Sequence, residues 1–100
     1  MERERQGGWV YIMANRYRGT LYVGSTADLA ERLSQHREGR GSRFCAEHGL
    51  TRLVWAELFA TMQEAMDHEK RLKRWHRAWK IELIEKANPD WRDLFDHILK

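Results

Sequence analysis

The sequence has a single cysteine, Cys45, a single proline, Pro89, and no long run of apolar residues. One thiol cannot form an internal disulfide, so we expect a reducing, cytoplasmic environment and a packing role for Cys45. Without further thiols, and with no HxxxH or HExxH pattern among the five histidines, the chain lacks the common zinc motifs. No apolar stretch approaches the roughly 20 residues of a membrane span, and we expect no secretory leader.

The sequence also lacks linkers, repeats, low-complexity tracts and a glycine-rich phosphate loop. Its 100 residues, 42% of them hydrophobic and 11% aromatic, suffice for one packed core. We therefore predict a flexible N-terminus over residues 1–7, a single domain over 8–96 and a tail over 97–100.

The charge is mildly basic, with a formal net value of +3. Such a balance permits a polyanionic partner without requiring one. Lysines and arginines concentrate between Lys70 and Lys80, where they alternate with two tryptophans and one histidine. On charge alone, this segment is either a solvated helix face or a surface that binds phosphates.

Aromatic and β-branched residues predict strands over 8–14, 20–25 and 52–60. The short turn over 15–19 makes the first two an antiparallel hairpin. The order ββαβαα, with a possible short C-terminal helix, predicts an α+β fold in which helices flank a small three-stranded antiparallel sheet.

Capping patterns locate the helices. Asp28 with Glu31 resembles a capping box for a helix that runs to about Arg37 and stops at the glycines of 38–42. Thr61 can cap a helix that runs to about Trp75. Further helices are predicted at 77–87, before Asn88-Pro89, and within 90–100, whereas residues 43–51 remain ambiguous.

Polar residues lie close to the predicted core at three places. In the first helix, Leu29 and Leu33 define the buried stripe, and Arg32 and His36 share a face beside it. Both polar residues are either boundary residues, with the arginine stem covering the core, or functional groups.

Glu69 is the second such place, because it falls within the apolar stripe formed by Met62, Ala65 and Leu72. A carboxylate there is costly unless it is paired or binds a metal. The alternatives are a structural ion pair with a lysine or arginine, a side chain that reaches water, and a functional role.

The hairpin is the third place. Strand parity directs Trp9, Tyr11 and Met13 to one face and Val10 and Ile12 to the other. If Tyr11 pairs opposite Tyr22, both hydroxyls point to the same side of the sheet, whereas a one-residue slip would separate them.

Together these positions resemble the GIY-YIG nuclease superfamily. The half-motifs appear as Trp9-Val10-Tyr11 and Tyr22-Val23-Gly24, with tryptophan and valine in place of the first glycine and isoleucine. "DLAERLSQH" resembles the family's arginine-bearing helix and "EAMDHEKRLKRW" its glutamate-bearing helix. The later "K...LI...NP.W.DL" pattern is similar to the small, single-domain bacterial branch, so the resemblance covers about Gly8 to Leu94.

The resemblance implies an endonuclease that hydrolyses DNA with one Mg²⁺ or Mn²⁺ ion. It implies that Glu69 binds the metal, Arg32 contacts the phosphate and Tyr22 is the general base. Tyr11 would position water or phosphate, and His36 would shuttle the proton or bind a phosphate oxygen. Asn88 is a candidate for the family's terminal asparagine, although it is equally a helix stop. Flanking phosphates would be bound without sequence preference by the basic residues Lys70, Lys73, Arg74, Arg77 and Lys80.

Two other functions remain open. One is a nucleic-acid-binding module of the same fold that cleaves poorly or not at all, and the other is an interaction protein with exposed tryptophans. The nuclease hypothesis requires the two tyrosines, Arg32 and Glu69 to meet in one solvent-reachable pocket. A carboxylate on the far side of the sheet from the phenols would contradict it.

Overall fold

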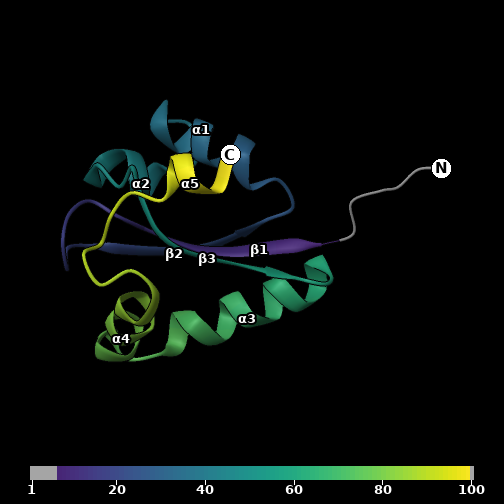
Figure 1. The fold of residues 1–100 in the computed structure, drawn as a ribbon. Helices are drawn as coiled ribbons and strands as arrows, with labels where there is room; N and C mark the ends of the chain where they lie inside the picture. The colour runs from purple at the N-terminus through teal and green to yellow at the C-terminus, as the bar shows by residue number, and fades with distance from the viewer. Residues whose placement is uncertain (1–6, 100) are drawn as a thin grey trace.

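The computed structural model describes residues 7–99 (Figure 1). Its elements follow one another as β1 (Gly8–Ala14), β2 (Leu21–Thr26), α1 (Leu29–Arg37), α2 (Arg43–His48), β3 (Arg52–Phe59), α3 (Met62–Arg74), α4 (Arg77–Ala87) and α5 (Phe95–Leu99). Residues 1–6 of the predicted flexible N-terminus, and residue 100 of the predicted tail, lie outside this range. Residues 97–99, also placed in the tail, belong to α5.

The sheet has the strand order β2-β1-β3, and both pairings are antiparallel. Helices α1, α2 and α5 cover one face, and α3 and α4 cover the other, which confirms the predicted α+β fold (Figure 1). Within residues 7–99, no helix combines the length and apolar character needed to cross a membrane.

The order is ββααβααα: α5 is the short C-terminal helix that was predicted as possible, and α2 is the element that the sequence left ambiguous. The Ser42 side chain accepts a hydrogen bond from the Cys45 amide at the start of the helix. Gly49, with φ of 65°, ends it in the left-handed region that favours glycine. Only six residues lie between the two caps, too few for a clear helical period.

The sheet carries a core on each face, as the parity of β1 predicts. Val10 and Ile12 pack among residues of α3 and α4, whereas Tyr11 and Met13 pack among residues of α1 and α2. The β1–β3 register shifts between Ile12 and Met13. Such a bulge breaks the alternation of a strand, and two successive β3 residues, Val54 and Trp55, belong to the core on the α3 face.

The chain after α4 covers part of the outer edge of β3. The Asp93 side chain accepts a hydrogen bond from the Leu53 amide at 3.1 Å, and the Leu94 amide donates to the Leu53 carbonyl at 2.7 Å. Arg52 donates to the carbonyl of Trp91 at 3.1 Å. Both backbone polar groups of Leu53 are therefore bonded to the segment after α4.

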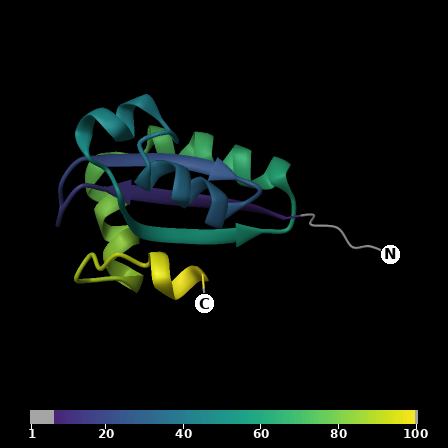
Figure 2. The same ribbon diagram turned by 90° about the horizontal axis from the view of Figure 1, so that it is seen from above.

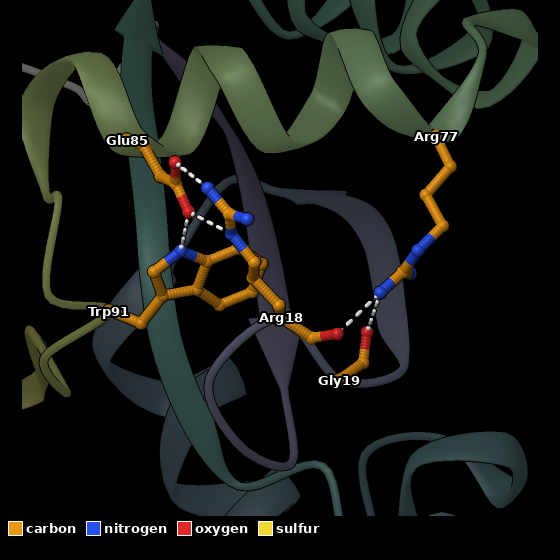
Figure 3. A network of polar contacts seen from close by, with 5 residues as sticks. All are labelled: Arg18, Gly19, Arg77, Glu85 and Trp91. Carbon is orange, nitrogen blue, oxygen red and sulfur yellow. Dashed lines mark hydrogen bonds and ion pairs between the residues drawn. The ribbon is translucent and has the colours of Figure 1, made fainter.

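A polar network fixes the β1–β2 turn to α4 (Figure 3). Glu85 accepts two hydrogen bonds from Arg18, at 2.6 and 2.7 Å, and one from the indole nitrogen of Trp91 at 2.7 Å. These bonds, first from Arg18 and then from Trp91, lower the pKa of Glu85 to about 2. Arg77 donates to the carbonyls of Arg18 and Gly19 at 2.6 and 2.7 Å. The guanidinium of Arg77 is thus engaged by the turn instead of being free for a phosphate.

Candidate active site

The two hairpin tyrosines lie on the same face of the sheet, although they do not pair directly. Tyr11 is opposite Gly24, and Tyr22 is opposite Met13, so the direct pairing considered above does not occur. The offset is two residues, which preserves the face because side chains alternate along a strand. The ring centroids of the tyrosines are 6.3 Å apart.

Gly24 makes room for the phenol of Tyr11. A Cβ atom at this position would lie 2.7 Å from both Cζ and Oη of Tyr11, and 2.9 Å from Cε2 of Tyr22. Real Cβ atoms do not approach other atoms so closely, so any side chain would displace the buried phenol. The glycine of the second half-motif is therefore a steric requirement of the site.

Helix α1 supplies a histidine to the phenols. Asp28 caps this helix by accepting a hydrogen bond from the Glu31 amide, as predicted. The buried His36 ring places Nε2 3.0 Å from the Tyr11 hydroxyl, and its centroid is 5.8 Å from that of Tyr22. Its other face lies against Gly41, where a Cβ atom would be 2.7 Å from Nδ1.

Burial keeps the Tyr11–His36 pair uncharged. Desolvation, followed by the neighbouring Tyr22, raises the pKa of Tyr11 above its usual range, and the positive charge of Arg32 opposes this only in part. Desolvation, followed by the same arginine, lowers the pKa of His36. Near neutral pH, the pair is a phenol bonded to a neutral imidazole. His36 Nδ1 is buried and has no hydrogen-bond partner within residues 7–99.

The lowered pKa of His36 predicts lower stability in mild acid. The unfolded chain takes up a proton near the ordinary pKa of 6.5, whereas the native chain takes it up only at lower pH. The free energy of unfolding should therefore fall as the pH drops below 6.5, with a slope of up to about 1.4 kcal/mol per pH unit. Urea unfolding at several pH values between 7.5 and 5.5 measures this change in the free energy of unfolding.

The matched control for this pH dependence is the exposed histidine His97. His36→Gln should remove the contribution of His36 and leave that of His68, whose pKa is also lowered by desolvation, and His97→Gln should leave the dependence as in the native chain. Equal slopes for the native chain and His36→Gln would show that His36 titrates normally.

Arg32 lies beside this pair, and only some of its guanidinium hydrogen-bond donors have a partner among the described residues. One terminal nitrogen donates to the Gly41 carbonyl at 3.1 Å. The Nε atom is buried and, within the described residues, has no partner. Leaving a buried charged donor unpaired costs about 1–3 kcal/mol or more. An anion that accepted this hydrogen bond would remove the cost.

Glu69 comes from the opposite layer. Helix α3 packs on the face that does not carry the tyrosines, so Glu69 can approach them only around the edge of the sheet. Helical spacing predicts which side of a helix is buried, but not which face of the sheet the helix covers. On helix α3, Glu69 accepts a hydrogen bond from the Ser25 hydroxyl and forms an ion pair with Lys73 at 2.7 Å. One of the predicted structural alternatives, an ion pair with a lysine, is thus present.

The two layers nevertheless approach each other at the β2 edge. Helix α3 runs along the β2 side of the sheet (Figure 2), and β2 is an edge strand. Glu69 is bonded to Ser25, the residue after the Gly24 over which the Tyr11 phenol lies. Its charge is also close enough to contribute to the raised pKa of Tyr11. The carboxylate therefore lies at the rim of the sheet and not beneath its centre.

The residues at this edge can hold at most a lightly coordinated metal ion. Among residues 7–99, no three histidines, cysteines, aspartates or glutamates form a metal-binding group. Glu69, with 19% of its side chain exposed and the Ser25 hydroxyl beside it, offers hard oxygen ligands. Such a donor set fits Mg²⁺, which retains several waters and needs one or two carboxylates. Lys73 would have to move aside.

Asn88 lies away from this edge. Its amide nitrogen donates to the carbonyls of Val54 and Arg92 at 3.1 and 2.9 Å, and its oxygen accepts from the Arg92 amide at 3.0 Å. It follows the last residue of α4, as the helix-stop alternative predicts. These bonds fix the chain beside β3, the other edge strand, so Asn88 does not join the tyrosines.

The predicted basic surface is divided between structural and exposed groups. Arg77 holds the turn, and Lys73 pairs with Glu69. Lys80 is half-buried, and desolvation, followed by the charge of Arg77, lowers its pKa. Lys70 and Arg74 are exposed on α3.

Sequence reasoning missed an aromatic stack on α2. The Phe44 ring is nearly parallel to that of Tyr22, with centroids 6.4 Å apart, and to that of His48, at 4.3 Å. The four-residue spacing of Phe44 and His48 was a usable signal, because such residues share a helix face. It could not be used without first recognising the helix.

Comparisons with known proteins agree with this geometry. The family described as "GIY-YIG catalytic domain" matches residues 7–82. A UPF0213 protein of Bacillus pumilus is 37% identical over 82 residues, which cover 82% of this chain and 84% of that protein. A UPF0213 protein of Aeromonas salmonicida is 35% identical over 88 residues, which cover 87% of this chain and 63% of that longer protein. The solution NMR structure of a UPF0213 protein from Bacillus halodurans has a TM-score of 0.52 at 30% identity, and covers 82% of this chain and 86% of that one.

Proposed function

Because this chain belongs to the GIY-YIG catalytic domain family, we propose that it is a metal-dependent endonuclease that hydrolyses DNA phosphodiester bonds. The observation that carries the proposal is the buried, unpartnered Nε of Arg32 beside the Tyr11–His36 pair, among the residues that the structure describes. An unpaired guanidinium nitrogen next to two phenols is suited to an anion whose charge increases during reaction.

In this proposal Arg32 binds the scissile phosphate. Its guanidinium keeps its charge at any working pH and can donate parallel hydrogen bonds to two phosphate oxygens. The bond to the Gly41 carbonyl orients the group before the substrate arrives. As charge develops on the phosphate oxygens, the same hydrogen bonds become stronger, which lowers the barrier.

The tyrosines and His36 divide the proton chemistry. Tyr11, whose pKa is raised by burial, acts as a hydrogen-bond donor that positions water or phosphate. Tyr22 is half-buried and is the general base of the proposal. His36, uncharged and bonded to Tyr11, orients the hydroxyl of that phenol.

Glu69 is the proposed ligand of one Mg²⁺ or Mn²⁺ ion, with the Ser25 hydroxyl beside it. When bound, such an ion supplies Lewis-acid stabilisation of the phosphate charge. Lys70 and Arg74 would bind flanking phosphates, a contact that does not depend on sequence. We therefore propose a preference for the shape of the DNA and not for its sequence.

A second candidate is a nucleic-acid-binding module that cleaves poorly or not at all. The ion pair between Glu69 and Lys73 favours it, because an ammonium group occupies the proposed metal ligand. This module would need only the exposed basic residues, and its affinity for DNA would fall steeply with salt.

The test incubates the protein with branched, flapped, single-stranded and duplex DNA, in Mg²⁺, in Mn²⁺ or in chelator. The expected result is cleavage that requires the metal and is lost in Glu69→Ala. Cleavage that persists unchanged in Glu69→Ala would come from a contaminant and would remove the mechanism. Salt-sensitive binding without cleavage would support the second candidate.

A further inference from the structure

Helix α2 presents an exposed aromatic ring beside the candidate site. Phe44 is 41% exposed. The plane of its ring is tilted by 27° from the plane of the Tyr22 ring. The exposed His48 stacks on Phe44 with the same 27° between planes and a centroid distance of 4.3 Å. The three rings thus form a stack that begins at a proposed catalytic residue and ends at the surface.

Core packing does not account for this arrangement. The buried residue of α2 is Cys45, the immediate neighbour of Phe44, so the helix turns a different side to the core. An exposed phenylalanine forfeits much of the free energy that burial would provide. Phe44 lies between Tyr22 and His48, so a further aromatic group would extend the stack at His48 and shield the exposed part of Phe44.

We propose that Phe44 and His48 form a stacking platform for an unpaired nucleobase of the DNA strand whose phosphate is bound by Arg32. The choice of ligand rests on the proposed function, because the platform is continuous with Tyr22. Every base has a flat π-face, so aromatic side chains bind unpaired bases with little regard to sequence. The exposed Arg43 next to Phe44 pairs with Glu47 at 3.4 Å, and its guanidinium would have to turn from this surface pair to contact the adjoining backbone.

The platform specifies the class of substrate. Bases in an intact duplex are stacked on their neighbours and are not available to the platform. A flap, a gap or a single-stranded arm offers a free base without the cost of unstacking a pair. The preferred DNA should therefore carry an unpaired nucleotide directly beside the phosphate that is cleaved.

The test measures binding in chelator, so that no cleavage is required. Anisotropy of labelled flap, single-stranded and duplex DNA gives affinities, and 2-aminopurine at the unpaired position reports stacking directly. We expect Phe44→Ala to weaken binding of flap and single-stranded DNA by about tenfold, with little effect on duplex. The fluorescence change of 2-aminopurine should also be lost.

Matched variants separate stacking from folding and from general surface effects. Phe44→Trp should restore binding, and Phe44→Leu, which keeps an apolar side chain, should not. Trp79→Ala removes a more exposed ring, at 54%, from α4 on the other side of the sheet and should bind as the native chain does. Thermal melts confirm that each variant is folded.

The outcomes distinguish this inference from the proposed function. Unchanged affinity in Phe44→Ala, or equal losses on duplex and flap DNA, would overturn the platform even if the chain cleaves DNA. An equal loss in Trp79→Ala would also overturn it. Phe44-dependent binding by a chain that never cleaves would support the platform and contradict only the nuclease.

Discussion

Arg32→Ala is expected to lower the rate of DNA cleavage by about 100- to 1,000-fold, because removing one donor to a developing anion has effects of this size. The fold should survive, since the guanidinium makes one hydrogen bond to a backbone carbonyl and its Nε makes none within residues 7–99. Cleavage of a flap substrate at saturating Mg²⁺ gives the rate, and circular dichroism reports the fold.

Two controls test the assignment of Arg32. Arg43→Ala removes an exposed arginine near the same site and should reduce the rate much less. Arg32→Lys keeps the charge but loses the planar pair of donors, so it should recover only part of the rate. Global unfolding of Arg32→Ala would instead support the structural alternative, in which the arginine stem covers the core.

Trp91→Ala is expected to lower the free energy of unfolding by about 3–5 kcal/mol. Trp91 is fully buried, and its indole nitrogen donates to Glu85, which also pairs with Arg18. Truncation would leave a cavity and remove one bond from the network that holds the β1–β2 turn (Figure 3). Because a domain has only about 5–15 kcal/mol of stability, the variant should be close to unfolding at 37 °C.

Urea unfolding followed by far-ultraviolet circular dichroism measures this loss without relying on tryptophan fluorescence. Trp91→Phe should have an intermediate effect, because it keeps most of the volume but loses the hydrogen bond. Trp79→Ala, at an exposed position, should stay within about 0.5 kcal/mol of the native chain. If Trp91→Ala matched this control, Trp91 would not be part of the core.

Local patterns in the sequence predicted most helices and strands, and which side of β1 each residue faces. Asp28 and Thr61 accept hydrogen bonds from the amides three residues later, as their capping patterns indicate. The alternation along β1 placed Tyr11 and Ile12 in opposite cores. These properties depend on a few neighbouring residues, so a single sequence is enough to derive them.

Properties set by contacts between distant residues were less accessible. The offset of Tyr11 from Tyr22 depends on strand register, and the layer of Glu69 depends on where the chain crosses the sheet after β3. Arg77 resembled a phosphate ligand by charge, although the carbonyls that it binds lie almost 60 positions away, with separations of 59 and 58 residues. No local pattern encodes such partners.

The segment after α4 has a further consequence through its bonds to β3. A strand at the margin of a sheet can recruit an extended peptide from another molecule when its amides and carbonyls are free. At Leu53 both groups are already used by Asp93 and Leu94 of the same chain. Removing the chain from Asp93 onward should expose the backbone groups of Leu53 at the edge of the sheet. The truncated protein should then self-associate in a concentration-dependent way, which size-exclusion chromatography would reveal.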